Sequence, residues 1–394
     1  MKNKICILVA LQFIISLLFT QTTIAQEKNW IKENITFYGY VKYLNTAQFQ
    51  SLDAILSDNL IHNRLNLKVY LNSNFTTALE VRNRVFWGNT MQLNPNYADQ
   101  INTDIQDIDL SSNIIDEPAL LLHSKIDRFY LDYQSDKWHV VLGRQRINWG
   151  KNLAWNPNDL FNAYSFFDFD YEERPGADAL RIQYYTSGNS SIETAINYTD
   201  KWEGNTVALK FNFNKYNYDF QILVAKYLND YTLGMGWEGA IKNVGIKGEL
   251  SYFTPNNGTE DQKEVFVSAI SIDYYFKNGL STNLGTLYNS LGVNSQSEYD
   301  IADFSNFKQT AKTLMPNRWS FFGQISKSIT PALNTSFSTI YAHELKGVYM
   351  TPQISYNLVQ NWDFDLIAQV FYGKYNENFS NLSNSIFLRF RWSY

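Results

Sequence analysis

The sequence predicts an all-β fold, a single transmembrane antiparallel β-barrel of about 18 strands, with 16 strands as the alternative. Three observations predict it: an export signal at the start of the chain, apolar and polar residues that alternate in segments of about ten, and connections that are short at one end of the strands and long at the other. We expect three parts: a cleaved signal peptide at residues 1–25, a short periplasmic segment at 26–34, and the barrel at 35–394.

Residues 1–25 have the features of a Sec-type signal peptide. Lys2 and Lys4 precede an apolar run over residues 5–18, and small residues before and at Ala25 suit cleavage. Because the run is shorter than the ~20 residues of a membrane-spanning helix, export is favoured over an uncleaved anchor. Cys6, the only cysteine, lies in this signal, so the mature chain would carry neither a disulfide nor a reactive thiol.

Composition excludes several other classes. After the signal there is no apolar stretch long enough for a membrane-spanning helix. The chain has 27 Tyr, 27 Phe and 10 Trp against only 8 Pro and 19 Gly, which favours strands over disorder. The net charge of −5 becomes −7 once the two signal lysines are removed, so a nucleic-acid partner is disfavoured.

Alternation with a period of two is clearest in two neighbouring segments. Leu65, Leu67 and Val69 alternate with polar residues, and Leu79 and Val81 begin the same pattern in the next segment. One apolar and one charged face fit a soluble sandwich as well as a barrel with a wet interior, so the pattern alone leaves both open.

The spacing of the segments separates these two alternatives. The predicted strands are 35–44, 61–72, 77–88, 125–134, 137–147, 177–186, 190–199, 205–214, 217–228, 230–240, 243–254, 264–277, 280–289, 317–328, 332–343, 346–357, 362–373 and 384–394. Short turns alternate with longer segments, which are 45–60, 89–124, 148–176, 255–263, 290–316 and 374–383. Short periplasmic turns and long extracellular loops are typical of membrane barrels, although the connections near residues 229 and 345 fall on the outer side and are short.

The last predicted strand ends on an aromatic residue. Phe390, Trp392 and Tyr394 alternate with polar residues, and the chain stops at Tyr394. This ending resembles the assembly signal of bacterial outer-membrane barrels. It implies the barrel assembly machinery and outer-membrane lipid as partners, and the outer membrane as the location.

Basic residues mark one wall of the predicted lumen. They are Arg64, Lys68, Arg82, Arg84, Arg128, Arg144, Arg146 and Arg181. A lipid-facing arginine at the bilayer midplane costs about 2–4 kcal/mol, which favours an inward direction. Two interpretations stay open: the charges select solutes, or they only hydrate the lumen and pair with acids such as Glu80 and Asp132.

Arg144 and Arg146 do not fit strict alternation. If Trp138, Val140 and Leu142 face lipid, both arginines would face lipid as well. Either a bulge at Gly143 resets the pattern, or the strand is flipped so that Val141 and Ile147 face outward.

The third long loop, 148–176, carries a group of acids. They are Asp159, Asp168, Asp170, Glu172 and Glu173. If the loop folds inward, these acids face the basic wall across a constriction, and the transverse field discriminates between charged or dipolar solutes. If the loop stays outside, it is a solvated acidic cap.

A motif lies where this loop begins. The run Arg144-Gln145-Arg146-Ile147-Asn148-Trp149-Gly150, followed by Asn156-Pro157, resembles the strand-and-loop motif of porin-like outer-membrane barrels, including alginate-export-type channels and relatives from Bacteroidota. The barrel resemblance covers nearly the whole mature chain, whereas the motif covers only this segment. It implies an outer-membrane porin or substrate-selective channel for passive diffusion of small polar or charged solutes. The alternative is a non-transport barrel that acts in polysaccharide or envelope assembly or as a surface scaffold.

Other features of the sequence bear on mechanism. About nine residues between the signal and the first strand leave no room for a plug domain, which favours diffusion. The four histidines form no metal-binding spacing, and no Gly-x-Ser-x-Gly motif is present. We therefore expect no catalytic site, no metal and no cofactor, while an oligomer is compatible with the sequence.

Overall fold

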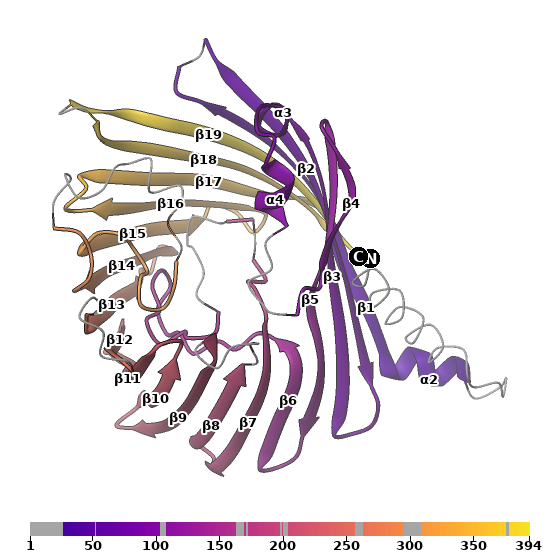
Figure 1. Cartoon of the computed structure of the whole chain (residues 1–394), viewed down its shortest axis with the longest axis vertical. Coiled ribbons are helices and arrows are strands. Elements are labelled where there is room, and N and C mark those ends of the chain that lie inside the picture. The colour runs from indigo at the N-terminus through magenta and orange to yellow at the C-terminus, as the bar shows by residue number, and fades with distance from the viewer. Residues whose placement is uncertain are drawn as a thin grey trace.

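The computed structural model is a ring of antiparallel strands with long connections inside it (Figure 1). It describes residues 27–51, 53–102, 108–162, 169–170, 172–197, 199, 204–256, 263–294, 307, 309–375 and 378–394. The predicted signal peptide, residues 1–25, lies outside the described residues. Within the described ranges, no helix combines the length and the apolar character needed to cross a membrane.

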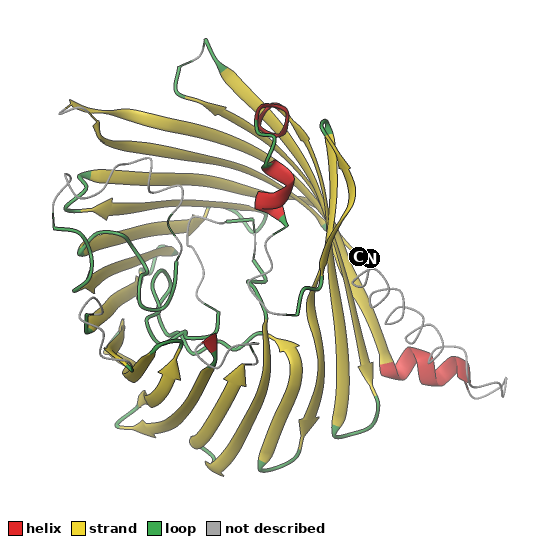
Figure 2. Cartoon of the chain, in the orientation of Figure 1, coloured by secondary structure: helices red, strands yellow, loops and turns green. Residues whose placement is uncertain are grey.

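Strands dominate the described chain (Figure 2). The strands are β1 (Ile35–Phe49), β2 (Ile55–Tyr70), β3 (Phe75–Gly88), β4 (Ser111–Glu117), β5 (Leu120–Gln134), β6 (Trp138–Gln145), β7 (Ala177–Ser187), β8 (Ser190–Asn197), β9 (Thr206–Lys215), β10 (Tyr218–Tyr227), β11 (Asp230–Ile241), β12 (Val244–Pro255), β13 (Val265–Tyr275), β14 (Leu280–Asn289), β15 (Trp319–Ser328), β16 (Leu333–Ala342), β17 (Gly347–Val359), β18 (Trp362–Tyr375) and β19 (Asn378–Ser393). The helices are α2 (Glu27–Asn34), α3 (Asn89–Leu93) and α4 (Tyr97–Ile101).

The barrel is closed by pairing between its first and last strands. β1 pairs with β19 in antiparallel register, with Tyr40 opposite Ser393, and also with β2. β4 is not a barrel strand. It pairs with residues 120–125 of β5, whereas the barrel strand β6 pairs with the same edge of β5 at residues 129–134. Of the 19 strands in the sheet, the 18 others form the closed barrel, so the predicted count of 18 is confirmed.

The prediction of two long outer loops is wrong. The segments 45–60 and 374–383 are instead tight hairpins, because β1 continues to Phe49, β2 begins at Ile55, and β18 and β19 almost meet between Tyr375 and Asn378. These strand ends are rich in Asn, Ser, Thr and Gln, so they lack the apolar alternation that marks a lipid-facing strand. The predicted loop 89–124 contains α3, α4 and β4, whereas the short outer connections near residues 229 and 345 are confirmed.

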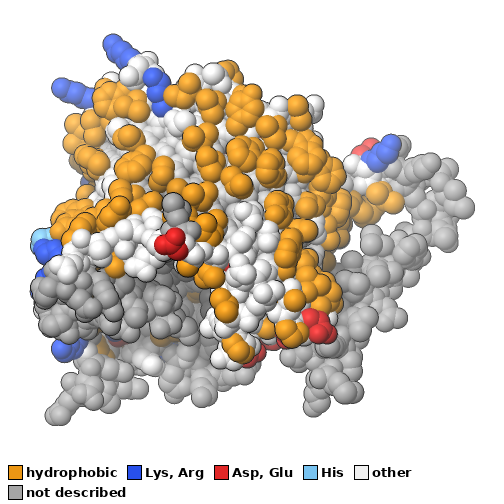
Figure 3. Space-filling model, turned by 90° about the horizontal axis from the view of Figure 1, so that it is seen from above, with side chains coloured by type: hydrophobic (Ala, Val, Ile, Leu, Met, Phe, Trp, Pro, Cys, Tyr) orange, Lys and Arg blue, Asp and Glu red, His pale blue; other side chains and the backbone are white. Residues whose placement is uncertain are grey.

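The two faces of each strand differ as the alternation predicts. In β13, Ile270 and Ile272 are exposed on the outer face, whereas Val267, Ala269 and Ser271 are buried against the interior. Figure 3 shows hydrophobic side chains spread over one outer side of the molecule, with most charged side chains at its margins. The outer face is therefore suited to lipid contact, and the polar face points into the lumen.

Two connections fold into the interior and create a core there. The connection after β6 brings Trp149, Trp155 and Phe161 against the barrel wall, and the connection after β14 brings Leu314 and Met315 into the same apolar cluster. These loops lie within the ring of strands in Figure 2. The core of this protein is therefore inside the barrel.

Candidate functional site: the charged lumen

The first part of the connection between β6 and β7 is fixed to the inner wall; we call residues 147–162 the anchor segment. Glu249 on β12 is fully buried and accepts hydrogen bonds from the backbone N–H groups of Lys151 (2.5 Å) and Asn158 (2.9 Å). Ser271 on β13 donates to the side chain of Asn152 (2.6 Å). Buried N–H groups need acceptors, so the side chain of Glu249 holds the anchor segment at a fixed position.

Aromatic contacts reinforce this attachment. The Trp149 indole donates to Glu193 on β8 (2.8 Å), and the Trp149 carbonyl accepts from Gln221 on β10 (2.9 Å). Trp155 packs edge-on against Phe322 of β15 with ring centroids 6.3 Å apart. The anchor segment thus covers the inner face of the wall from β8 to β15.

The second part of the same connection contacts the other side of the barrel; we call residues 169, 170 and 172–174 the acidic strap. Asp170 lies 2.8 Å from Lys42 Nζ on β1, 3.3 Å from His62 Nδ1 on β2 and 3.4 Å from Arg389 Nη1 on β19. Glu172 pairs with Arg391 (3.1 Å). One carboxylate therefore joins the inner faces of three adjacent strands at the closure of the barrel.

The strap is also held by hydrogen bonds and by an aromatic contact. Tyr40 on β1 donates to Glu173 (2.8 Å), and Arg128 on β5 donates to the backbone carbonyls of Glu173 (2.7 Å) and Arg174 (2.8 Å). Phe169 packs against Phe387 with ring centroids 4.7 Å apart. β1, β2 and β19 lie across the ring from β10 to β13 (Figure 1), so the anchor segment and the acidic strap contact opposite sides of the lumen.

The buried carboxyls of this connection have opposite electrostatic environments. Burial alone would raise the pKa of Asp170, but the hydrogen bond from His62 and the charge of Lys42 outweigh it and hold the pKa well below its usual range. For Asp159, which is only 2% exposed, burial raises the pKa to about 6, although the backbone N–H of Trp149 partly opposes this.

Arg64 is the centre of an ion-pair network on β2. It is fully buried, contacts Asp127 (2.5 Å) and Glu80, and lies 3.7 Å from Glu173 of the strap. Arg82 on β3 also pairs with Asp127 (3.2 Å). Because a buried charge without a partner costs several kcal/mol, this network fixes the positions of these arginines.

The other predicted basic residues differ in their surroundings. In the strand register, Lys68, Arg84, Arg128 and Arg181 lie on the inner face together with Arg64 and Arg82. Arg84 lies 3.2 Å from His123, Lys68 lies over the ring of Tyr70, and Arg181 pairs with Glu193 (2.6 Å). Six of the eight predicted basic residues therefore share the inner face.

Arg144 is placed in a way that neither alternative anticipated. Val141 is 4% exposed and Leu142 is 58% exposed, so β6 is not flipped, and its pairing shows no register shift at Gly143, despite a φ of 116°. Arg144 shares the outer face with Leu142 but is buried, since it pairs with Asp178 (2.7 Å) and donates to the carbonyl of Ile108 (2.5 Å). Arg146 follows the end of β6 and is exposed.

Several residues of the charged lumen were not singled out in the sequence. They are Tyr40, Lys42, His62, Asp127, Glu193, Lys210, Asp230, Glu249, Lys312, Asp365 and Arg389. Alternation could have placed Lys42 and Arg389 on the inner face, since both alternate with outward aromatic residues. Their partners lie in distant segments and leave no local signal. Asp168 lies outside the described residues.

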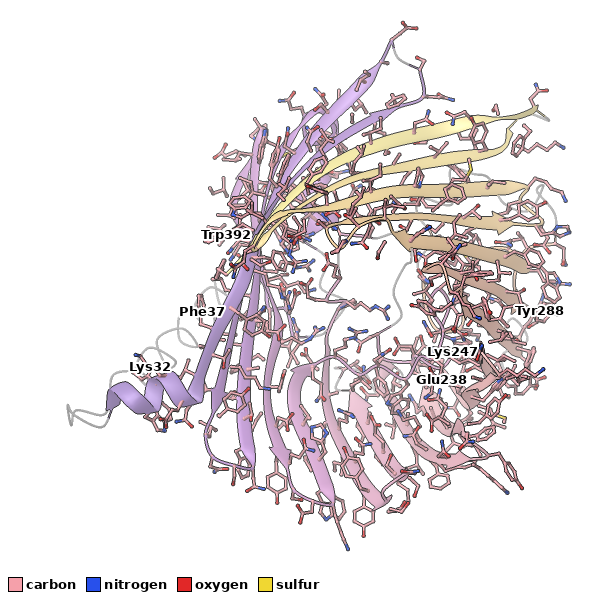
Figure 4. All side chains as sticks on the ribbon, turned by 180° about the vertical axis from the view of Figure 1, so that it is seen from behind. Lys32, Phe37, Glu238, Lys247, Tyr288 and Trp392 are labelled. Atoms are coloured by element: carbon pink, nitrogen blue, oxygen red, sulfur yellow. The ribbon has the colours of Figure 1, made fainter. Side chains whose placement is uncertain are left out.

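The aromatic residues at the end of the chain lie on the outer face of β19. Trp392 stacks on Trp362 with ring centroids 6.2 Å apart, and its ring lies 5.1 Å from that of Tyr394. Figure 4 shows Trp392 near Phe37 at the junction of β1 and β19. Phe390 packs against Phe364 of β18 (4.9 Å between centroids).

Charge pairs also line the wall opposite the strap. Lys247 on β12 pairs with Glu238 on β11 (2.6 Å); Figure 4 shows both on the lumen side, whereas Tyr288 points outward. Lys312, in the connection after β14, pairs with Asp230 (2.8 Å). Within the described residues, no group of three His, Asp or Glu side chains could hold a metal ion.

The fold and the lumen together define the class: an 18-stranded antiparallel β-barrel with an apolar outer face and a charged lumen, whose opposite walls are contacted by the anchor segment and the acidic strap of the β6–β7 connection. No protein-family model and no curated protein matches the sequence.

Solved structures share the fold. OccAB4 of Acinetobacter baumannii aligns with a TM-score of 0.56 at 10% identity over 92% of this chain and 98% of that one. OccK5 of Pseudomonas aeruginosa gives 0.57 at 9% identity over 92% and 99%, and the outer membrane protein OprD of the same organism gives 0.57 at 7% over 91% and 93%. At these identities the likeness establishes the fold of the chain.

Proposed function

We propose that this protein is an outer-membrane porin or substrate-selective channel through which small polar or charged solutes diffuse passively. The observation that carries the proposal is the contrast between the apolar outer face and the charged inner face of a closed barrel. Such a barrel is stable in lipid because all backbone groups of the wall are paired, and its interior provides a polar path across the bilayer. The fold likeness to the outer membrane protein OprD supports this location.

We further propose that the connection 148–176 narrows the lumen and sets its selectivity. Its acids at 170, 172 and 173 meet Lys42, Arg64 and Arg389 on one wall, and its anchor segment meets Glu249 on the other. Fixed charges of both signs in a narrow polar path create a field that acts on passing ions. In this proposal the basic residues on the inner face, Arg64 to Arg181, line the path.

The N-terminal signal, assembly through the aromatic ending, contact with outer-membrane lipid and possible oligomers belong to the same proposal. So does the finer resemblance to alginate-export-type channels and Bacteroidota relatives, which rests on the motif that begins at Arg144. We propose no catalytic role for the charged lumen, in which Asp170, Asp127 and Glu193 are joined to basic side chains in ion pairs.

A second candidate is a barrel that does not transport, such as an envelope-assembly factor or a surface scaffold. It is favoured by the extent to which the anchor segment and residues 310–315 pack inside the barrel. Electrical measurements distinguish the two, because a filled barrel conducts no ions. A folded protein that gives no open-channel current in a planar bilayer would overturn the channel and favour the scaffold.

The selectivity proposal is tested by Asp170→Asn. Removal of this carboxylate leaves Lys42 and Arg389 with less compensation, so the lumen becomes more positive. We expect the reversal potential in a KCl gradient to move toward chloride preference. Asp136→Asn, the same change in the exposed turn between β5 and β6, should leave the reversal potential as in the wild type. Equal reversal potentials for Asp170→Asn and wild type would contradict a selective role of the strap.

A further inference from the structure

We propose that the lumen contains a binding site for an uncharged, polyhydroxylated solute the size of one sugar ring, on the β14–β17 side of the barrel near its periplasmic turns. This inference rests on the proposed channel function and names the class of solute. It arises from a part of the wall whose own side chains are uncharged and which the Asp365–Arg389 pair borders on β18.

The inner face of β14–β17 near those turns carries only hydroxyl and amide side chains; we call it the neutral wall. Ser281 of β14 lies opposite Ser326 of β15, and Ser326 lies opposite Ser336 of β16. Gln324 and Ser338 form the next row. These side chains point inward, because Phe322 on the same face of β15 contacts Trp155 inside the barrel.

A cavity of about 270 Å³ opens on this wall. It is lined by Tyr275, Ser281, Ser326, Asn334, Ser336 and Ser355, together with residues of the adjoining turn. Lys327 also borders it, but Lys327 alternates with Ser326 and pairs with Leu280, so its side chain lies on the outer face and it contributes main-chain atoms. The cavity is smaller than the ~300 Å³ at the low end of drug-sized sites, which fits a single ring better than a chain.

Several hydroxyl and amide groups of the neutral wall can form further hydrogen bonds. Among the described residues, the hydroxyls of Ser281, Ser326 and Ser336 and the amide of Gln324 make no hydrogen bond to another side chain or to the backbone. Ser338 beside Gln324 is only 7% exposed, faces inward and also lacks a partner in this part of the chain. A buried polar group normally has a partner, so a solute that both donates and accepts would complete this wall.

The chemistry of the wall favours an uncharged solute. Serine, asparagine and glutamine both donate and accept, as sugar hydroxyls do, whereas an ion would lose hydration without gaining a counter-charge from these side chains. The charged groups that border the wall are acidic: Asp273 on β13, and Asp365 on β18, which accepts from Ser355 (2.5 Å) and pairs with Arg389 (2.9 Å). An anion is therefore disfavoured. The ring of Tyr275 offers a flat face to the C–H groups of a sugar.

The test compares three solutes of nearly equal size on single channels of the full protein in planar bilayers: glucose, gluconate and glucosamine. We expect glucose to reduce the KCl current in a dose-dependent way at concentrations where gluconate and glucosamine have no effect. If gluconate or glucosamine reduces the current as strongly as glucose, the uncharged class is overturned.

The site itself is tested with the triple variant Ser281→Ala, Ser326→Ala, Ser336→Ala. Loss of three hydrogen-bonding hydroxyls should raise the half-blocking concentration of glucose at least about tenfold, with KCl conductance unchanged. Thr339→Val, a similar change on the outer face beside Ser338, should leave the blocking concentration unaltered. The single variant Ser326→Ala, expected to cause a several-fold rise, replaces the triple variant if that fails to fold.

The outcomes separate the two proposals. A folded wild-type barrel without any current contradicts the proposed channel function. A conducting barrel whose current glucose leaves unchanged, or whose glucose block survives the serine substitutions, contradicts only the neutral-wall site.

Discussion

Asp159 and Asp170 belong to the same connection, yet their carboxyl groups lie in opposite surroundings. Asp170 is held by Lys42, His62 and Arg389, which stabilise its charge. Asp159 is buried in the anchor segment beside Leu160 and Phe161, and among the described residues its carboxyl accepts one hydrogen bond, from the backbone N–H of Trp149 (3.4 Å). One acid therefore stabilises the fold as a charged group, and the other as a neutral one.

This difference predicts a pH dependence of the anchor segment. The pKa of Asp159 is raised from 3.8 to about 6, so its contribution to stability is complete below the ordinary value and is lost as the pH rises through about 6, by at most about 3 kcal/mol. In the wild type, protection of residues 147–162 against amide exchange should fall as the pH rises from about 4 to about 6.5. Asp159→Asn, neutral at every pH, should reduce this dependence.

The control for this measurement is Asp136→Asn in an exposed turn, which should keep the wild-type profile. The strap responds in another range: the lowered pKa of Asp170 and Glu173 means that their contribution is present above their ordinary values and is lost as the pH falls below about 4. An Asp159→Asn variant that loses as much protection as the wild type over the same pH range would assign the pH dependence to another group.

At the scale of the strands, the seam between β1 and β19 depends on one glycine. Gly39 exchanges backbone hydrogen bonds with Tyr394 (3.1 and 3.0 Å), and the Tyr394 hydroxyl donates to the carbonyl of Arg64 (3.2 Å). A Cβ at position 39 would collide with that carbonyl and lie 2.8 Å from the tyrosine hydroxyl. A side chain at this position therefore separates three strands at the point where the barrel closes.

We expect Gly39→Ala to reduce the yield of folded barrel, because an open seam leaves unpaired backbone groups on β1 and β19. The measurement is the fraction of protein that keeps its compact, heat-modifiable mobility in detergent gels. Gly285→Ala on β14, where the nearest atom to an added Cβ is 3.6 Å away, should fold as the wild type does. Equal yields for both variants would show that the seam tolerates the extra carbon.

At the scale of the whole molecule, the distribution of side chains is the reverse of that in a water-soluble globular protein. The outer face of the barrel is apolar, and the interior is polar or filled by loops. Neighbouring residues of one strand therefore tolerate very different substitutions. Leu284 of β14 is 55% exposed on the outer face, and Asn283 points into the lumen beside Gln324.

Leu284→Arg should destabilise the barrel by about 2–4 kcal/mol in lipid if Leu284 lies near the bilayer midplane, because a guanidinium there faces hydrocarbon. Asn283→Arg places the same group in the wet lumen and should change the unfolding free energy far less. Denaturant unfolding of both variants in lipid vesicles tests this. Similar losses for the two positions would contradict the assignment of the inner and outer faces.

Much of the wall could be predicted from the sequence. The alternation around Leu65 and Leu79 identified strands and their lipid faces, because a strand turns successive side chains to opposite sides wherever it lies. β4 and the extended hairpin ends escaped prediction, since residues such as Asn45 and Ser57 extend the sheet without an apolar face.

The sequence by itself predicted the barrel, about 18 strands with 16 as the alternative, and the inner position of most basic residues, since these follow from local alternation and from the lengths of the connections. Only the tertiary structure decided that the anchor segment and the acidic strap contact opposite walls, that Asp170 joins Lys42 over a separation of 128 residues, and that a neutral wall remains on β14–β17. The physical reason is that these features depend on which side chains meet once the barrel has closed, and partners that meet across a closed ring leave no periodic pattern along the chain.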